Sequence, residues 1–138
     1  MGTEENKALV RRWLKSHESG FPDVDLLGPD HVNHNVPPGM PQGREGSRVG
    51  LELLHKAFSE LRWNIEDMVA EGDKVAVRGT VRMKHTGDFH GIKATGKEIT
   101  FPAIQIWTIK NGKLADLWEQ NDTLSFMQQL GAIPAPKP

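Results

Sequence analysis

The last third of the chain holds one acidic residue in a setting where a carboxylate could do acid–base chemistry. Glu119 lies between Leu117 and Asn121, inside a run with the pattern of a β-strand. A carboxylate buried among apolar side chains is costly to ionise, so burial raises its pKa and can make it a general base or acid near neutral pH. The plain alternative is a solvent-facing Glu119, as is usual for glutamate. The direction of this side chain therefore decides what chemistry the strand can support.

Asp122 follows the same strand, and its structural interpretation is stronger than a catalytic one. It directly precedes TLSFMQQL (123–130), which has the pattern of a short amphipathic helix and is followed by Gly131. Aspartate is preferred at the N-cap of a helix, and glycine is common just past the C-terminus. We therefore expect Asp122 to cap a helix.

The six histidines form no metal-binding motif. His31 and His34 are three residues apart in a loop-like segment, the chain has no cysteine, and no HExxH sequence is present. His85 and His90 lie in a Gly-rich segment. We expect no metal ion and roles at the surface or the rim of a pocket. His34, next to Asn33, and His85 could each donate a hydrogen bond to a substrate carbonyl.

The composition limits the partners of the chain. Its 138 residues carry a formal net charge of −1 with scattered lysines and arginines, which does not suggest nucleic acid or an acidic membrane as a partner. The absence of cysteine excludes disulfides and thiolate chemistry. No apolar stretch has the length of a membrane span, and the N-terminus lacks the pattern of a signal peptide. We expect a cytoplasmic protein with one domain.

Hydrophobic periodicity predicts helices in the first half of the chain. One helix is expected to start at Thr3 and to stop near Gly20, and a second runs from about Glu45 to Leu61. Residues 24–27 suggest a short helical turn, and residues 28–43 suggest an irregular loop rich in Pro, Gly, His and Asn. The side chains expected on the buried side of the second helix are Val49, Leu53, Leu54, Ala57, Phe58 and Leu61.

The second half has the period of β-strands. Strands are expected at 63–70, 75–85, 98–109 and 113–121, before the helix at 123–130. Helices followed by an antiparallel meander indicate an α+β domain. The tail, residues 132–138, is expected to be extended or disordered.

Three segments, in their order and spacing, resemble the SnoaL-like polyketide cyclases of the nuclear transport factor 2-like superfamily. They are PDHVNH (29–34), HTGDFHGIKATGK (85–97), and NGKLADLWEQND with QQLG (111–122 and 128–131). The resemblance covers nearly the whole chain and implies a single SnoaL-like domain over residues 1–138. It implies a cone-shaped α+β fold, in which a curved antiparallel sheet packs on the N-terminal helices around a deep apolar pocket. It also implies catalysis without a cofactor: a carboxylate removes a proton between carbonyls, and the enolate closes a ring by intramolecular aldol addition.

The resemblance assigns site residues position by position. Counted back from QQLG without gaps, the family's catalytic aspartate falls on Glu119, a pocket histidine on Gln105, and an early-loop asparagine on Asn33. Two further polar helpers of the family fall on Ala103 and Leu117, which are apolar here. We therefore expect Glu119, Gln105 and Asn33 to be catalytic. The residues expected to bind the substrate are His34, His85, Trp107, Leu117, Ala103 and Phe58.

The turn between the last two strands decides whether the main residues of this site share a face. With a two-residue turn, Lys110 pairs with Lys113, and Gln105 points away from Glu119. With a three-residue loop, 110–112, Gln105 and Glu119 lie on one face. The family resemblance favours the three-residue loop, which is therefore our expectation.

Other functions stay open beside the enzyme. The apolar Leu117 and Ala103 favour a non-catalytic module that binds a small apolar ligand, and a dimerisation domain with a vestigial pocket is a third interpretation. Epoxide hydrolysis ranks lower, because it usually needs two carboxylates and an arginine. In each binding role we expect a small apolar or aromatic ligand, with carbonyl groups if the protein is an enzyme.

A second apolar cluster predicts a homodimer. In the three-residue register, the face opposite the pocket gathers Ile104, Ile106, Leu114 and Trp118. No helix is left to cover these side chains, and exposed apolar patches of this size usually mark an interface. Burial under the C-terminal tail is the alternative.

Overall fold

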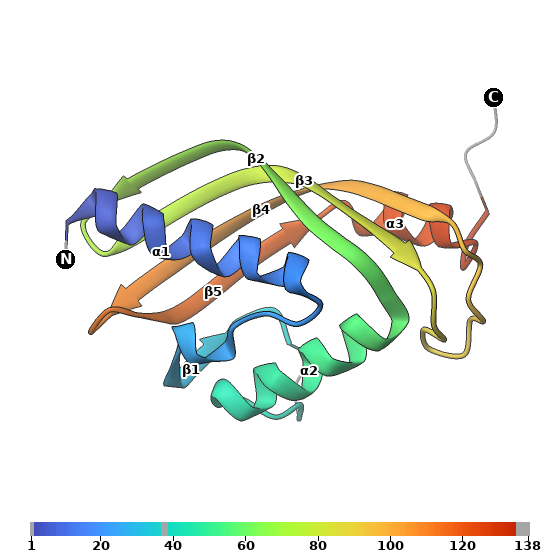
Figure 1. The fold of residues 1–138 in the computed structure, drawn as a ribbon, viewed down its shortest axis with the longest axis horizontal. Helices are drawn as coiled ribbons and strands as arrows, with labels where there is room; N and C mark the ends of the chain where they lie inside the picture. The colour runs from blue at the N-terminus through green and yellow to red at the C-terminus, as the bar shows by residue number, and fades with distance from the viewer. Residues whose placement is uncertain (1, 37–38, 135–138) are drawn as a thin grey trace.

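A computed structural model describes residues 2–36 and 39–134, which form a strongly curved five-stranded sheet with three α-helices (Figure 1). The helices are α1 (Thr3–Ser16), α2 (Gly43–Ala57) and α3 (Thr123–Leu130), with short 3-10 turns at His17–Ser19 and Val24–Leu26. The strands are β1 (Leu27–Asn33), β2 (Phe58–Glu71), β3 (Lys74–His85), β4 (Glu98–Lys110) and β5 (Lys113–Asn121). The predicted α+β fold is confirmed. Of the predicted tail, residues 135–138 lie outside the described residues.

The sheet is mixed, with the strand order β1-β5-β4-β3-β2. The four strands from β2 to β5 pair antiparallel, as predicted. We expected an irregular loop over residues 28–43, and this is wrong for its first part. There the chain forms β1, which pairs parallel to β5 at the edge of the sheet. Pro29 and Gly28 made this segment look irregular, yet an edge strand tolerates proline because its outer N–H groups need no partner strand.

Helix α2 ends earlier than predicted. The chain becomes a strand at Phe58, which pairs with His85 of β3, so the last predicted turn of the helix is absent. Two positions that we expected on the buried side, Val49 and Leu53, are 41% and 60% exposed. The helix contacts β1 and β2 with its other side, since pairing in the sheet outweighs the local apolar pattern.

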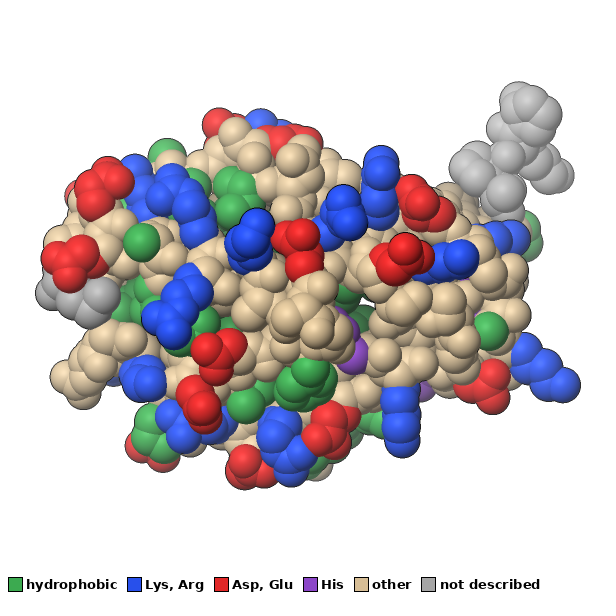
Figure 2. All heavy atoms as spheres, in the orientation of Figure 1, with side chains coloured by type: hydrophobic (Ala, Val, Ile, Leu, Met, Phe, Trp, Pro, Cys, Tyr) green, Lys and Arg blue, Asp and Glu red, His purple; other side chains and the backbone are tan. Residues whose placement is uncertain are grey.

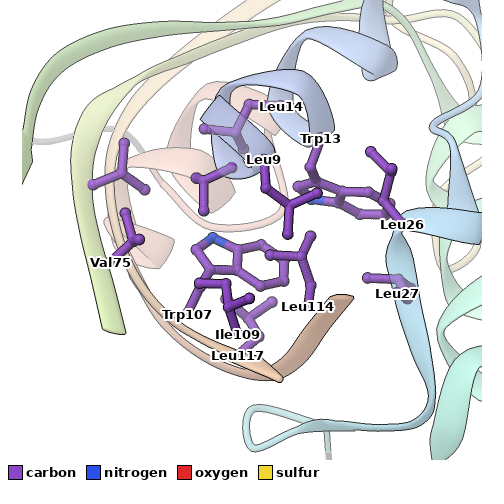
Figure 3. Close-up of a cluster of buried hydrophobic side chains, with 12 residues drawn as sticks. Leu9, Trp13, Leu14, Leu26, Leu27, Val75, Trp107, Ile109, Leu114 and Leu117 are labelled. Atoms are coloured by element: carbon purple, nitrogen blue, oxygen red, sulfur yellow. The ribbon is translucent and has the colours of Figure 1, made fainter. Parts of the chain in front are cut away.

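Helix α1 lies across the concave side of the sheet, where its apolar stripe makes one core (Figure 3). The indole ring of Trp13 meets that of Trp107 edge-on, with ring centroids 5.9 Å apart. A second core forms at the other end of the sheet, where Phe58 contacts Phe89 and Phe126. None of the helices in the described part of the chain is long and apolar enough to cross a membrane.

Gly79 allows a close approach between β3 and the side chain of Trp63 on β2. A Cβ atom at this position would lie 2.5 Å from the carbonyl oxygen of Asn64 and 3.0 Å from Cε3 of Trp63. The carbonyl belongs to the backbone of a paired strand, so it cannot move aside cheaply. Glycine is therefore required here for space.

We predict that Gly79→Ala lowers the free energy of unfolding by about 1–3 kcal/mol, the usual cost of overpacking. Chemical denaturation monitored by tryptophan fluorescence measures it. Gly50→Ala is the matched control, because Gly50 lies inside α2 and a Cβ atom there would meet no atom from outside its own helix within 4 Å. The control should leave stability unchanged or raise it by up to about 1 kcal/mol, since alanine favours helices. Equal midpoints for the two variants would contradict the prediction.

Candidate active site

A cavity of about 360 Å³ lies between the concave face of the sheet and helices α1 and α2. Its walls are mostly apolar, and its indole rings come from Trp13, Trp63 and Trp107. Within the described residues, Glu119 is the one acidic side chain in the lining. The polar side chains of the lining are Glu119, Gln105, Asn121, Asn33, Ser47, His17 and His31. A mostly apolar cavity with a few converging polar groups has the character of a small-molecule site.

The turn between β4 and β5 differs from our expectation. Lys110 pairs with Lys113, so the turn has two residues, and the three-residue loop is wrong. Asn111 and Gly112 have φ angles of 52° and 71°, as a type I′ turn requires, and both residue types adopt this conformation readily. The preference of Asn-Gly for this turn outweighed the register that the family resemblance favoured.

A bulge at Ala115 restores the arrangement that the turn alone would prevent. Ile109 pairs with Leu114 and Thr108 with Asp116, so Ala115 is an extra residue in β5. Before the bulge Leu114 faces the core, and after it Leu117 and Glu119 face the cavity. Gln105 thus lies directly opposite Glu119. The prediction that they share a face is confirmed, although the cause is the bulge and not the turn.

A chain of hydrogen bonds ends on the carboxylate of Glu119. Nε1–H of Trp107 donates to Oε1 of Gln105 at 2.9 Å, and Nε2–H of Gln105 donates to Oε2 of Glu119. An indole N–H can only donate, so the amide oxygen of Gln105 must face it. The amide NH₂ group is thereby directed at the carboxylate.

Burial raises the pKa of Glu119 above its ordinary value of 4.5, because ionisation would leave a charge in a mostly apolar cavity. The hydrogen bonds from the side chains of Gln105 and Asn121 act against burial and lower the pKa. Burial is the largest of these effects. A carboxylate whose pKa is moved toward neutrality is suited to take up and return a proton.

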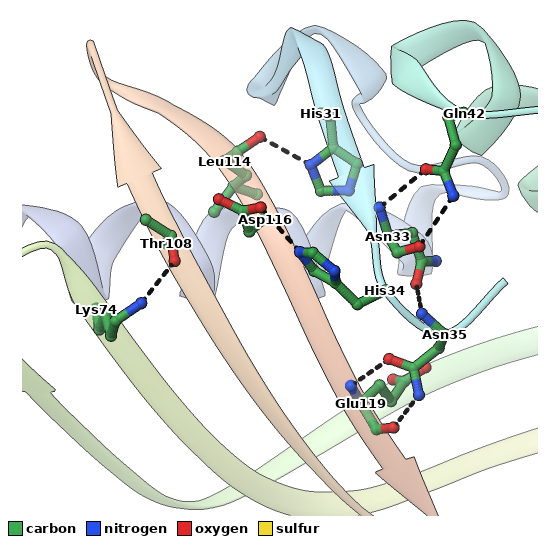
Figure 4. A network of polar contacts seen from close by, with 10 residues as sticks. All are labelled: His31, Asn33, His34, Asn35, Gln42, Lys74, Thr108, Leu114, Asp116 and Glu119. Carbon is green, nitrogen blue, oxygen red and sulfur yellow. Dashed lines mark hydrogen bonds and ion pairs between the residues drawn. The ribbon is translucent and has the colours of Figure 1, made fainter.

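Side-chain amides hold the segment after β1 to β5 (Figure 4). The backbone N–H of Glu119 donates to Oδ1 of Asn35 at 2.6 Å, and Nδ2–H of Asn35 donates to the Glu119 carbonyl. The amide of Gln42 makes the same two bonds with the backbone of Asn33, each at 3.3 Å. These amides replace strand partners where β1 ends, so they fix the backbone of both Asn33 and Glu119 beside the cavity.

Asn33 lines the cavity, in agreement with its predicted place in the site. Its Oδ1 accepts the backbone N–H of Asn35 at 2.9 Å. Within the described residues its Nδ2 makes no hydrogen bond, so this amide can donate to a ligand. The catalytic role of Asn33 stays a prediction.

His34 lies outside the cavity lining. Its ring stacks on Trp118 of β5 with centroids 4.2 Å apart. Figure 4 shows its Nε2 directed at Oδ1 of Asp116, at a distance of 3.0 Å. Asp116 and Trp118 follow the bulge on the outer face of the sheet, so the pocket contact expected for His34 is not formed. The alternation of β1 directs His31, not His34, to the cavity.

The other predicted binding residues divide into two groups. Trp107 and Leu117 line the cavity, and Ala103 is buried in the neighbouring core. His85 and Phe58 lie in that core as well and are absent from the lining, with ring centroids 5.2 Å apart. The structure thus gives these two rings packing contacts where we expected ligand contacts.

The sequence analysis missed four polar residues of the lining: Asn121, Ser47, His31 and His17. Asn121 could have been found from strand alternation, since it lies two residues after Glu119. His17 stood on the apolar face predicted for the first helix, which should have indicated burial. His31 carried no signal, because β1 was not recognised as a strand.

Asp122 has the structural role that its position predicts. Its Oδ1 accepts the backbone N–H of Ser125 at 3.0 Å at the start of α3, and Gly131 closes the helix with a φ of 90°. Within the described residues, no cluster of three or more His, Cys, Asp or Glu side chains could hold a metal ion.

Comparison with known proteins gives a consistent result. A family model described as SnoaL-like polyketide cyclase matches residues 8–130. The chain is 30% identical to the aklanonic acid methyl ester cyclase DnrD of Streptomyces peucetius, over 94% of this chain and 92% of DnrD. It is also 30% identical to the aklanonic acid methyl ester cyclase DauD of Streptomyces sp. strain C5, over 94% and 83%. The structure of TsrD from Streptomyces laurentii superposes with a TM-score of 0.84 at 28% identity, over 96% of this chain and 99% of TsrD.

We predict that Gln105→Met raises the pKa of Glu119 further, because it removes a hydrogen bond that favours the ionised form. NMR titration of the glutamate δ-carbons measures this shift. Gln120→Met is the matched control, since Gln120 is exposed on the neighbouring position of β5. A pKa that falls or stays constant in Gln105→Met would contradict the assigned hydrogen bond.

The same shift predicts how stability depends on pH. Because the pKa of Glu119 is higher in the folded state than in the unfolded state, proton binding favours folding. The cost of the buried charge is absent well below pH 4.5 and fully present above the folded-state pKa. We therefore predict that the free energy of unfolding of Glu119→Gln rises relative to that of wild type as the pH increases from 4.5 to above the folded-state pKa. Chemical denaturation of both proteins at a series of pH values measures this difference.

Proposed function

Because this chain belongs to the SnoaL-like polyketide cyclase family, we propose that it closes a ring in a polyketide by intramolecular aldol addition, with Glu119 as the general base. One observation carries the proposal: a carboxylate with a raised pKa faces a mostly apolar cavity and is oriented by Gln105. Glu119 stands where the family resemblance places the catalytic aspartate, and it carries the same carboxylate on a side chain one methylene group longer.

The reaction needs one proton transfer in each direction. The carboxylate of Glu119 takes a proton from a carbon between two carbonyl groups, and the electron pair forms an enolate. The enolate carbon then attacks a second carbonyl carbon of the same molecule, which closes the ring and leaves an alkoxide. Protonated Glu119 returns the proton to that oxygen. These steps use only this chain's own side chains.

An amide donor in the cavity suits the charge that develops on the substrate. The Nδ2–H of Asn33, which makes no hydrogen bond within the described residues, is a donor that a developing enolate oxygen requires. Gln105 holds the carboxylate in place, because its own donor is already directed at Glu119. We therefore assign Gln105 an orienting role and Asn33 the stabilisation of the oxyanion.

The names of the relatives suggest the first substrate to try. DnrD and DauD are cyclases of aklanonic acid methyl ester, which makes a methyl ester of a polyketide acid the substrate class that we propose. An ester keeps a charged carboxylate out of the cavity, and this matters because Glu119 already carries the costly charge.

Two alternatives are less well supported by the lining. Epoxide hydrolysis usually uses two carboxylates and an arginine, whereas the described lining contains one carboxylate and no arginine. A non-catalytic binding module is favoured by Leu117 and Ala103, which are apolar where the family resemblance implies polar groups. The raised pKa of Glu119 favours the enzyme over this module.

We predict that Glu119→Gln lowers the turnover of aklanonic acid methyl ester by roughly 10²-fold or more, because it removes the base and keeps the shape. Product formation followed by chromatography measures the rate, and calorimetry measures substrate binding, which should change little. Asp122→Asn is the matched control and should keep nearly full activity, since asparagine also caps helices. An essential Asp122 beside a dispensable Glu119 would refute the assignment. Binding without turnover by the wild type would support the binding module.

We also propose that the outer face of the sheet joins two copies of the chain. Ile106 and Trp118 are neighbours across β4 and β5 and are each 40% exposed, and Ile104 is 49% exposed. The prediction that Leu114 belongs to this patch is wrong, because Leu114 precedes the bulge and is buried in the core. Val69 of β2 is 65% exposed and continues the row of Ile106 and Trp118.

Charges beside this patch suit a two-fold interface. The Nζ atom of Lys74 lies 5.1 Å from the ring of Trp118, and Asp116 lies on the same face next to His34. Groups of opposite sign on one surface can meet their counterparts in a second copy related by a two-fold axis. Within the described residues no helix covers this face.

We predict a dimer at micromolar concentration and a monomer for Ile106→Lys, because a charge at the centre of the patch cannot be buried without a partner. Light scattering measures the mass. Leu124→Lys on α3 is the control, since Leu124 is 62% exposed and lies outside the patch. A monomeric wild type with an exposed Trp118 would refute the interface, and a monomer with a buried Trp118 would instead favour coverage by the tail.

A further inference from the structure

Two histidines from different helical segments form a pair at one wall of the cavity. His17 follows α1 and is only 7% exposed, whereas His55 lies near the end of α2 and is half-buried. Nδ1 of His17 lies 3.0 Å from Nε2 of His55, and the two ring planes are 12° apart. Trp13 packs edge-on against His17, and Phe21 packs edge-on against His55. Both imidazole rings are therefore held in fixed orientations.

The pair is separated from the proposed base by aromatic rings. The ring centroids of His17 and Trp13 are 5.4 Å apart, and those of Trp13 and Trp107 are 5.9 Å apart. Trp107 in turn donates to Gln105, which holds Glu119. Two indole rings thus lie between His17 and the Gln105–Glu119 pair. In the view of Figure 2, one patch of histidine atoms lies beside a hollow near the centre of the face.

Both histidines are neutral near neutral pH. Burial and the neighbouring His55 lower the pKa of His17 to about 3, and burial also lowers the pKa of His55. A neutral imidazole carries one N–H group, so one ring nitrogen donates and the other accepts. The direction of the hydrogen bond between the rings therefore fixes the tautomers of both.

The carbonyl of Gly20 favours one of the two directions. It acts on His55 as a hydrogen-bond acceptor and raises its pKa. The Nε2 atom of His55 faces His17, which leaves Nδ1 for this carbonyl. A carbonyl only accepts, so Nδ1 of His55 carries the proton and Nε2 is the acceptor. His17 must then donate through Nδ1, and its own Nε2 carries a lone pair.

The lone pair of His17 is available to a ligand. His17 is part of the cavity lining, and within the described residues its Nε2 makes no hydrogen bond. His31 shows the same pattern at the β1 wall, because its Nδ1–H donates to the Leu114 carbonyl at 2.9 Å (Figure 4). The cavity therefore presents imidazole acceptors, in contrast to the amide donors near Glu119.

We propose that Nε2 of His17 accepts a hydrogen bond from a hydroxyl group of the substrate, and that His55 is a positioning residue that holds His17 in the accepting tautomer. The cavity then selects a hydroxylated polyketide ester over its O-methylated or deoxygenated analogue. A ligand without a donor at this place leaves the buried acceptor without a partner, which costs free energy. This inference rests on the proposed function, because it takes the substrate to occupy the cavity.

Binding of three matched probes tests the selection. They are 2-hydroxyanthraquinone, 2-methoxyanthraquinone and anthraquinone, and a hydroxyl group at position 2 cannot bond to the quinone carbonyl of its own molecule. Wild type should bind the hydroxyl compound roughly 3- to 10-fold more tightly than either analogue, as one net hydrogen bond provides. Quenching of the cavity tryptophans measures affinity. His17→Phe should remove the preference, and His55→Phe should reduce it. His90→Asn, a change at an exposed histidine, should keep it.

NMR of ¹⁵N-labelled histidine rings tests the tautomer without a ligand and without activity. In the wild type, His17 should be protonated at Nδ1 and not at Nε2, and His55→Phe should mix the two forms. Protonation of His17 at Nε2, or equal binding of the three probes by wild type, would overturn the inference even where His17→Phe fails to fold. Turnover lost in Glu119→Gln with no hydroxyl preference in wild type would refute this inference alone. A hydroxyl preference with an active Glu119→Gln would refute the general base alone.

Discussion

A carboxylate can face this cavity only if hydrogen-bond donors offset part of the cost of removing it from water. Gln105 supplies one donor, and Trp107 fixes which end of that amide faces Glu119. The arrangement needs three side chains of two neighbouring strands on one face, and so it depends on their pairing to a single residue. The remaining wall is apolar, which keeps the proton affinity of Glu119 high. The orientation of the Glu119 carboxylate and its proton affinity therefore depend on the same few contacts.

The helices complete the site by closing the concave side of the sheet. Helix α1 contributes Trp13 to the wall and ends where His17 meets His55 of α2. The segment between β1 and α2 is tied to the sheet by the amides of Asn35 and Gln42. In the proposed reaction, the amide donor of Asn33 and the imidazole acceptors of His17 and His31 give the cavity both kinds of hydrogen-bonding group. A substrate with both carbonyl and hydroxyl groups can then be held at more than one point.

The sequence predicted the fold because apolar and polar residues alternate clearly in the strands from β3 to β5. It singled out Glu119 as a candidate base because this acidic residue interrupts such a strand. It failed where local signals compete with pairing. Pro29 concealed β1, which forms only when β5 is present beside it, and Phe58 left the predicted helix to pair with His85. The bulge at Ala115 has no local signature, since alanine fits on either face. We expected His34 to contact the ligand, whereas His31 lines the cavity. Because β1 was not recognised as a strand, its alternation could not be used to assign the faces of these two residues.

The bulge also determines where this chain can change in length during evolution. Gain or loss of residues in the 86–97 segment would alter a connection that lies outside the cavity lining. Loss of one residue between Leu114 and Leu117 would instead remove the bulge, and Leu117 and Glu119 would still pair with Trp107 and Gln105 in a regular strand. If the bulge straightened while its extra residue was kept, Trp118 would enter the cavity and Glu119 would reach the solvent. An alignment gap at the bulge is therefore compatible with the same catalytic apparatus, whereas a gap of one residue between Leu117 and Glu119 would mark a relative with a different one.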